Sequence, residues 1–144
     1  MKKSTFFKAT GVMLLITLLL FNGASTYAAA AQAVSPRYNN AVNVRTNSEI
    51  SSSGLLTISY SVTGIANVTT KIEVTTTIEK RVLGIFWSDV DISNPTNTSY
   101  NQTYNFTRSF QLEDSGTYRV TVLYKIYGTN GAVDEIETQD KLSY

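Results

Sequence analysis

The sequence predicts an all-β protein behind a short N-terminal leader. From Gly54 onward, apolar and polar residues alternate with the period of two that is typical of half-buried strands. Turn-forming residues, such as Gly64, Gly84 and the Asn130–Gly131 pair, separate the alternating runs. No run with helical periodicity occurs in residues 54–144, so we expect strands and turns throughout this part of the chain.

The N-terminal residues have the pattern of a secretory signal peptide. Lys2 and Lys3 precede an apolar run, residues 12–21, and a tract of small residues, 24–33, follows it. The apolar run is too short to cross a bilayer of about 30 Å as a helix. We therefore expect residues 1–28 to form a signal-peptide helix that is removed on export, giving a secreted, extracellular protein. Three cleavage positions have a suitable small residue, namely those after Ala28, Ala30 and Ala33.

Composition excludes several classes of function. The chain has no cysteine and no histidine, which removes disulfides, the commonest general base and most transition-metal sites. Removal of residues 1–28 takes away three of the 12 basic residues and none of the 11 acidic ones, which leaves a net charge of −2. Such a domain lacks the basic surface that attracts nucleic acid or anionic lipid. We expect no cofactor, no nucleic-acid partner and, because no second apolar segment follows the leader, no membrane anchor in the mature protein.

The first half of the mature chain contains two clear strands. Residues 29–50 are polar and irregular, and we expect a flexible mature N-terminus with an edge strand near residues 41–46. Alternation then predicts strands over residues 55–62 and 68–82. Lys80 is the one charged residue on the apolar side of the second strand. The β domain is therefore expected over residues 51–144.

The second half supplies the remaining strands. Gly84 breaks the long strand, a further strand begins at Ile85, and a loop rich in Asn, Thr and Ser follows. Alternation predicts a strand over residues 104–112, with Arg108 as an exception on its apolar side. Two final strands are expected over residues 117–126 and 133–144. The total is about seven strands in a single domain.

One motif indicates a type of fold. Residues 114–120, Asp-Ser-Gly-Thr-Tyr-Arg-Val, resemble the Asp-x-Gly-x-Tyr-x-Cys motif of immunoglobulin-like domains, with Val120 in the place of the cysteine. The resemblance implies a β-sandwich in which Tyr118 forms a tyrosine corner and Asp114 and Gly116 shape the turn before its strand. A sandwich of the fibronectin type fits the strand count equally well. These three residues are expected to be structural.

A second resemblance covers nearly the whole chain. The leader and the segments 34–40, 50–55 and 71–87 are similar to a family of small secreted proteins from clostridia and related Gram-positive bacteria. That family is a domain of unknown function. The resemblance implies secretion and a Gram-positive origin, and it brings no catalytic or binding residue.

An acidic string is the one candidate for a metal site. Asp89, Asp91 and Ser93 alternate in a loop, and oxygen ligands in such a pattern can hold calcium. The string lacks the glycine and the distal glutamate that complete an EF-hand loop. The alternative is a solvated loop whose acids cap turns, and we expect no metal.

Aromatic and apolar residues provide the candidates for binding. Alternation places Phe86 and Trp87 on opposite faces of one strand, so at least one of them is expected to be exposed and available to a sugar or a partner pocket. Leu123 and Tyr127, on the polar face of a later strand, form a second candidate patch. The alternative is that Trp87 belongs to the core and that a neighbouring segment covers the second patch.

Three functions are compatible with these observations. The first is a secreted, non-enzymatic module that binds a protein or a cell-envelope glycan. The second is a bacteriocin-like effector that acts on the envelopes of other cells. The third, a small hydrolase, has the weakest basis because the chain lacks histidine, cysteine and a convincing pair of catalytic acids.

Overall fold

A computed structural model describes residues 38–144, which belong to one compact unit. The predictions for the leader, its cleavage sites and residues 29–37 lie outside the described residues. Within them the fold-class prediction is confirmed, because all regular structure consists of strands in two antiparallel sheets. The strands are β1 (Ala41–Ile50), β2 (Leu55–Gly64), β3 (Thr69–Val82), β4 (Phe86–Val90), β5 (Thr96–Ser99), β6 (Thr103–Gln111), β7 (Thr117–Gly128) and β8 (Val133–Ser143).

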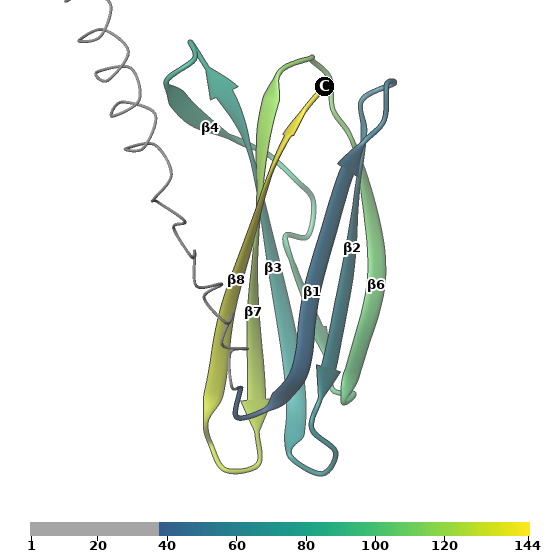
Figure 1. The fold of residues 1–144 in the computed structure, drawn as a ribbon, viewed down its shortest axis with the longest axis vertical. Helices are drawn as coiled ribbons and strands as arrows, with labels where there is room; N and C mark the ends of the chain where they lie inside the picture. Colours follow the sequence, from purple (N-terminus) through teal and green to yellow (C-terminus); the bar gives the residue numbers. More distant parts are fainter. Residues whose placement is uncertain (1–37) are drawn as a thin grey trace, which may run out of the picture. The chain divides into compact units, whose positions relative to one another are not determined.

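The two sheets form a β-sandwich with a divided edge strand. The smaller sheet has the order β1-β2-β6, and the larger has the order β4-β3-β7-β8, with β5 also paired to β3 (Figure 1). β4 pairs with residues 78–82 of β3, and β5 pairs with residues 72–75. In an immunoglobulin constant domain the fourth strand joins the sheet of the first two strands. Here the corresponding chain lies against the third strand and is interrupted by residues 91–95.

The sandwich begins earlier in the chain than residue 51, where the sequence placed its boundary. β1 continues to Ile50, beyond the predicted edge strand at residues 41–46, and it pairs with β2 from Ala41 to Ile50. This segment was difficult to predict because from Arg45 onward the outward side chains of β1 are polar or charged, and its inward ones include Thr46 and Ser48. The predicted flexible N-terminus therefore does not extend into residues 41–50.

Hydroxyl groups link the two sheets inside the apolar core. The Tyr60 hydroxyl on β2 lies 2.9 Å from the Thr76 hydroxyl on β3. Across the sandwich from β1, Thr46 lies 2.6 Å from the hydroxyl of Tyr124 on β7 and 2.6 Å from that of Thr138 on β8. Burial raises the pKa of Tyr124 to about 12. These hydrogen bonds join the sheets in a protein that has no cysteine.

The two charged exceptions in the strand pattern both have partners in loops. Lys80 donates to the Asp114 carboxylate at 2.8 Å. Arg108 donates to the backbone carbonyls of Asn94 and Ser93 at 2.7 and 2.6 Å. Each charged group thus connects a strand of one sheet to the loop that follows a strand of the other, at the open edge of the sandwich.

Buried polar groups fix the end of the sandwich at which β1 begins. Asp134 accepts hydrogen bonds from the backbone N–H groups of Asn39 and Asn40 at 3.0 and 2.7 Å. The Asn40 side chain, which is fully buried, donates to the carbonyls of Ile126 and Ala132 at 2.9 Å each. We call this cluster, Asn39, Asn40 and Asp134, the anchored end.

Candidate functional site

The β3–β4 hairpin extends past the rest of the larger sheet. β3 pairs with β7 only as far as Lys80, opposite Tyr118, whereas its pairing with β4 continues to Val82, opposite Phe86. In Figure 1 this hairpin stands apart at the end of the sandwich that also carries the C-terminus. The residues of its turn therefore lie beyond the strands that could cover their side chains.

Four apolar side chains are exposed together at this turn. The exposed fractions are 40% for Val82, 85% for Leu83, 69% for Ile85 and 61% for Phe86. Side chains of these types are usually buried, and a contiguous exposed group of them marks an interaction site. We call these four residues the hairpin tip.

The turn chemistry does not explain the leucine at the tip. Leu83 has a φ of 52° and Gly84 a φ of 73°, and the Ile85 N–H donates to the Val82 carbonyl at 3.2 Å. Hairpin turns with two such positive angles favour Asn–Gly, because a positive φ disfavours a bulky side chain. Leu83 therefore makes the turn less favourable and has no packing role, since it is almost fully exposed.

Trp87 lies at the base of the hairpin and is held by a charged pair. It is half-buried on the outer face of the larger sheet, with the Arg119 guanidinium 4.4 Å from its ring centroid. Arg119 in turn donates two hydrogen bonds to the Glu79 carboxylate, each of 2.5 Å. The pair lowers the pKa of Glu79 and raises the pKa of Arg119. Trp87 is thus neither part of the core nor a free surface aromatic.

The four residues predicted to form binding patches do not lie together. Phe86 and Trp87 occupy opposite faces of β4, and Phe86 is the more exposed of the two. Leu123 shares the outer face with Trp87, but it is four residues along β7 from Arg119, a separation of about 14 Å. Tyr127 lies four residues farther still, about 27 Å from Arg119.

Tyr127 belongs to a network of charged side chains. Its hydroxyl donates to the Glu73 carboxylate at 2.6 Å, and the Lys71 ammonium lies 3.8 Å from its ring centroid. Lys71 also pairs with Glu73 at 2.9 Å. The Tyr127 hydroxyl, together with Lys71, lowers the pKa of Glu73. The exposed surface of Tyr127 is therefore part of a polar face, not of an apolar patch.

The acidic string does not assemble a ligand set. Asp89 points to the outer face of the larger sheet beside Glu79, and Asp91 follows the end of β4. The Ser93 carbonyl already accepts a hydrogen bond from Arg108. Among residues 38–144, no group of three or more acidic, histidine or cysteine side chains is arranged to hold a metal ion.

The three residues predicted to be structural join the turn before β7 to its neighbours. The Tyr118 hydroxyl donates to the Asp114 carbonyl, four residues upstream. The Asp114 carboxylate pairs with Lys80. Gly116 exchanges two backbone hydrogen bonds of 2.9 Å with Tyr144.

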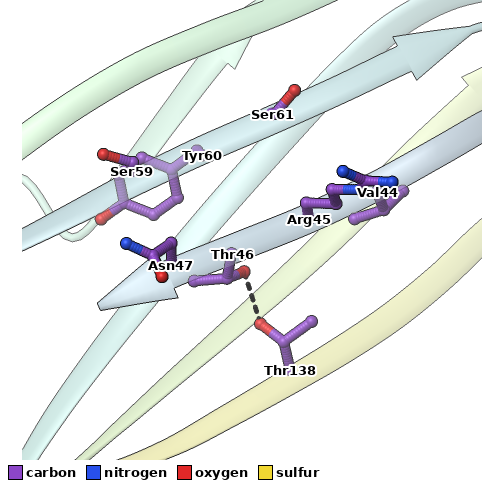
Figure 2. A pocket seen from close by; sticks show the side chains of 8 residues that line it. All are labelled: Val44, Arg45, Thr46, Asn47, Ser59, Tyr60, Ser61 and Thr138. Atoms are coloured by element: carbon purple, nitrogen blue, oxygen red, sulfur yellow. Dashed lines mark hydrogen bonds between the residues drawn. The ribbon is translucent and has the colours of Figure 1, made fainter. Parts of the chain in front are cut away.

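A second feature is an open hollow along β1 and β2 (Figure 2). Of the described residues that line it, only Arg45 carries a charge. Thr46 in its wall is bonded to Thr138, and the Tyr60 hydroxyl is bonded to Thr76. The described residues of this lining include no carboxylate and no histidine.

Alternation in the sequence identified Phe86 and Trp87 as candidates but did not single out Val82 and Leu83. The available signal was Leu83 itself, because it precedes Gly84 where a hairpin turn favours asparagine. An apolar residue in that position contradicts the local turn preference, and such a conflict is a sign of function.

Comparison with known proteins found no matching family model and no matching curated sequence. Within residues 38–144, no helix is long and apolar enough to cross a membrane. The hairpin tip is accordingly identified as a candidate site from its geometry alone.

Proposed function

We propose that the protein is a secreted, non-enzymatic binding module of a Gram-positive bacterium, and that it binds a component of the cell envelope through the hairpin tip. The observation that carries this proposal is the exposure of Val82, Leu83, Ile85 and Phe86 on one protruding turn. The signal-peptide pattern of residues 1–28 supports export.

A binding role accounts for two unfavourable features of the tip at once. The exposed side chains place apolar surface in water, and Leu83 adopts a positive φ that its side chain disfavours. Neither feature stabilises the sandwich. Both are explained if the tip is covered by a partner, because the hydrophobic contribution of the side chains then arises in the complex.

The arrangement of charged groups supports a non-enzymatic role. Glu73 and Glu79 are engaged with Lys71 and Arg119, and the hydrogen bonds that both carboxyls accept lower their pKa, which moves it away from neutral pH. A general acid at neutral pH needs a pKa raised toward that pH. These carboxylates are instead held in the form that makes ion pairs.

A binding assay with a matched control tests this proposal. Residues 29–144 are incubated with washed cell envelopes, and the bound fraction is measured by co-sedimentation. The variant Leu83→Asn/Phe86→Ser is expected to bind about tenfold more weakly, because it removes two apolar side chains from the tip. Tyr100→Ser removes an exposed aromatic from the opposite end and is expected to bind like the wild type. Equal binding by the wild type and the tip variant would refute the proposal.

A further inference from the structure

We infer that the partner is a lipid bilayer, into whose surface the hairpin tip inserts. This inference rests on the proposed function and deepens it, since a bilayer is one component of the envelope.

The exposed apolar side chains at the tip are not confined to one face of the strands, since two of the four lie in the turn. Val82 and Phe86 lie opposite each other on the side of the hairpin that continues the inner face of β3 and β4. Leu83 and Ile85 lie in the turn itself and are the two most exposed of the four. A protein groove contacts a strand or hairpin mainly on one face, whereas a bilayer contacts an inserted tip on all sides. The distribution matches the second case.

The order of residues along the hairpin matches the depth profile of a membrane surface. Residues 82–88 contain no charged side chain. Just behind the tip, Arg81 and Trp87 lie opposite each other in register. Tryptophan and arginine are typical of the boundary between headgroups and hydrocarbon, and apolar side chains lie below it. The hairpin thus presents an apolar apex followed by interfacial residues.

The length of the projection also fits. Leu83, in the turn, is three positions beyond Lys80, the last β3 residue paired with β7, and this distance is roughly 10 Å of extended chain. Apolar groups of peripheral proteins penetrate about 5–10 Å into the boundary of headgroups and acyl chains. The tip can therefore insert while the paired part of the sandwich stays in water.

Charge has a minor part in this interaction. Two of the basic groups at the base of the hairpin are paired, Lys80 with Asp114 and Arg119 with Glu79, and among the described residues Arg81 is left without an ion pair. We therefore expect binding to zwitterionic vesicles, and we expect it to persist at high salt, where electrostatic attachment is screened.

The test uses Trp87, which is the one tryptophan of the chain and lies directly behind the tip. Residues 29–144 are mixed with vesicles of phosphatidylcholine, alone or with phosphatidylglycerol, because the apolar leader would itself bind lipid. The strands and the core that the structure describes lie within residues 38–144, so this fragment contains the whole of the described sandwich. We expect a blue shift of Trp87 emission, quenching by brominated lipid, and co-sedimentation with both kinds of vesicle.

Variants separate insertion of the tip from attachment through another surface. Leu83→Asn/Ile85→Thr is expected to lower vesicle partitioning by about tenfold or more, with the sandwich intact, because Asn–Gly favours the turn and threonine favours strands. Tyr100→Ser is the matched control and is expected to partition like the wild type. Circular dichroism and thermal melting verify that each variant is folded.

Three outcomes would overturn the inference. The first is absence of vesicle binding by the wild type, the second is binding that salt abolishes, and the third is a tip-dependent dimer that forms without lipid. If the protein does not bind vesicles but still binds envelopes through the tip, the bilayer is excluded as the partner and the proposed function stands. If the tip variants bind envelopes like the wild type, the proposed function itself fails.

Discussion

The two ends of the sandwich depart from the usual pattern of burial in opposite ways. At the anchored end, polar side chains are buried: Asn40 is fully buried and Asp134 is 7% exposed. At the hairpin tip, apolar side chains are exposed, with Leu83 at 85%. The anchored end thus buries residue types that are usually exposed, and the hairpin tip exposes residue types that are usually buried.

Only one of these departures has an explanation inside the molecule. The Asn40 donors and the Asp134 carboxylate form hydrogen bonds with each other and with the carbonyls of β7 and the β7–β8 loop, so most of the buried polar atoms are compensated, and Asn40 Oδ1 is the one buried side-chain atom of the cluster without a partner. The tip has no such compensation among the described residues. A departure that the fold itself does not explain is the better indicator of function, and the following predictions test that distinction.

The largest effect is expected from removal of the carboxylate at the anchored end. Asp134→Ala leaves the buried Asn40 N–H and the part-buried Asn39 N–H without their acceptor. We expect a loss of about 3 kcal/mol in the free energy of unfolding, measured by urea denaturation. Glu137→Ala, an exposed acid on the same strand, is the control and should change stability little. A loss below about 1 kcal/mol for Asp134→Ala would contradict the structural role of this cluster.

The next effect concerns alkaline pH and the hydroxyl groups between the sheets. Because the pKa of Tyr124 is about 12 in the folded state against 10.0 for an unperturbed tyrosine, its contribution to stability is complete below pH 10 and is lost as the pH rises toward 12. This linkage corresponds to roughly 2–3 kcal/mol. Tyr124→Phe should remove this part of the alkaline loss in urea titrations at several pH values. An unchanged slope in the variant would exclude Tyr124 as its source.

The tyrosine corner should contribute less. Tyr118→Phe removes the hydrogen bond to the Asp114 carbonyl while keeping the buried ring in place. We expect a loss of about 1 kcal/mol, measured by thermal melting. Tyr38→Phe, at a partly buried tyrosine near the start of β1, provides a comparison with the same chemical change. Full retention of stability in Tyr118→Phe would show that the hydroxyl has no structural role.

A smaller effect is expected at acidic pH on the outer face of the larger sheet. The lowered pKa of Glu79 means that its contribution is present above the unfolded-state pKa near 4.5 and is lost as the pH falls through the lower folded-state value. Solvent screens this pair, so Glu79→Gln should cost about 0.5 kcal/mol at neutral pH and nothing once the carboxylate is protonated. The same variant should alter Trp87 fluorescence, because Arg119 loses the partner that holds it over the ring. Identical acid titrations of variant and wild type would contradict this linkage.

The regular part of the fold was predictable, because alternation of residue types directly reflects which face of a strand is buried. The partners of the exceptions were not predictable. Lys80 and Arg108 were recognised as anomalies, but their partners Asp114 and the carbonyls of residues 93–94 lie in loops whose course no periodic pattern describes. The hydrogen bonds from Asn40 to Asp134 and to the Ala132 carbonyl were not predictable either, because about 90 residues separate the partners in the sequence.

The candidate site was predictable only in part for a geometric reason. Phe86 and Trp87 are neighbours in sequence, yet alternation sends them to opposite faces, and only register shows that Arg119 lies beside Trp87. Leu123 and Trp87 do share a face, but a sequence does not specify their distance along the sheet. The tip is exposed because β3 is longer than its pairing with β7. The extent of that pairing is known only once the register is known.

The last predicted effect is as small as that of Glu79→Gln, but it has the opposite sign and distinguishes the two ends most sharply. Leu83→Asn creates the Asn–Gly pair that a turn with positive φ at both positions favours, and it removes an apolar side chain from water. We expect the free energy of unfolding to rise by about 0.5 kcal/mol, measured by urea denaturation, because asparagine tolerates the positive φ better than leucine. A polar-to-apolar change at the anchored end destabilises the fold, whereas an apolar-to-polar change at the tip should stabilise it. If Leu83→Asn instead weakened the fold, the leucine would have a structural role, and its exposure would no longer point to a partner.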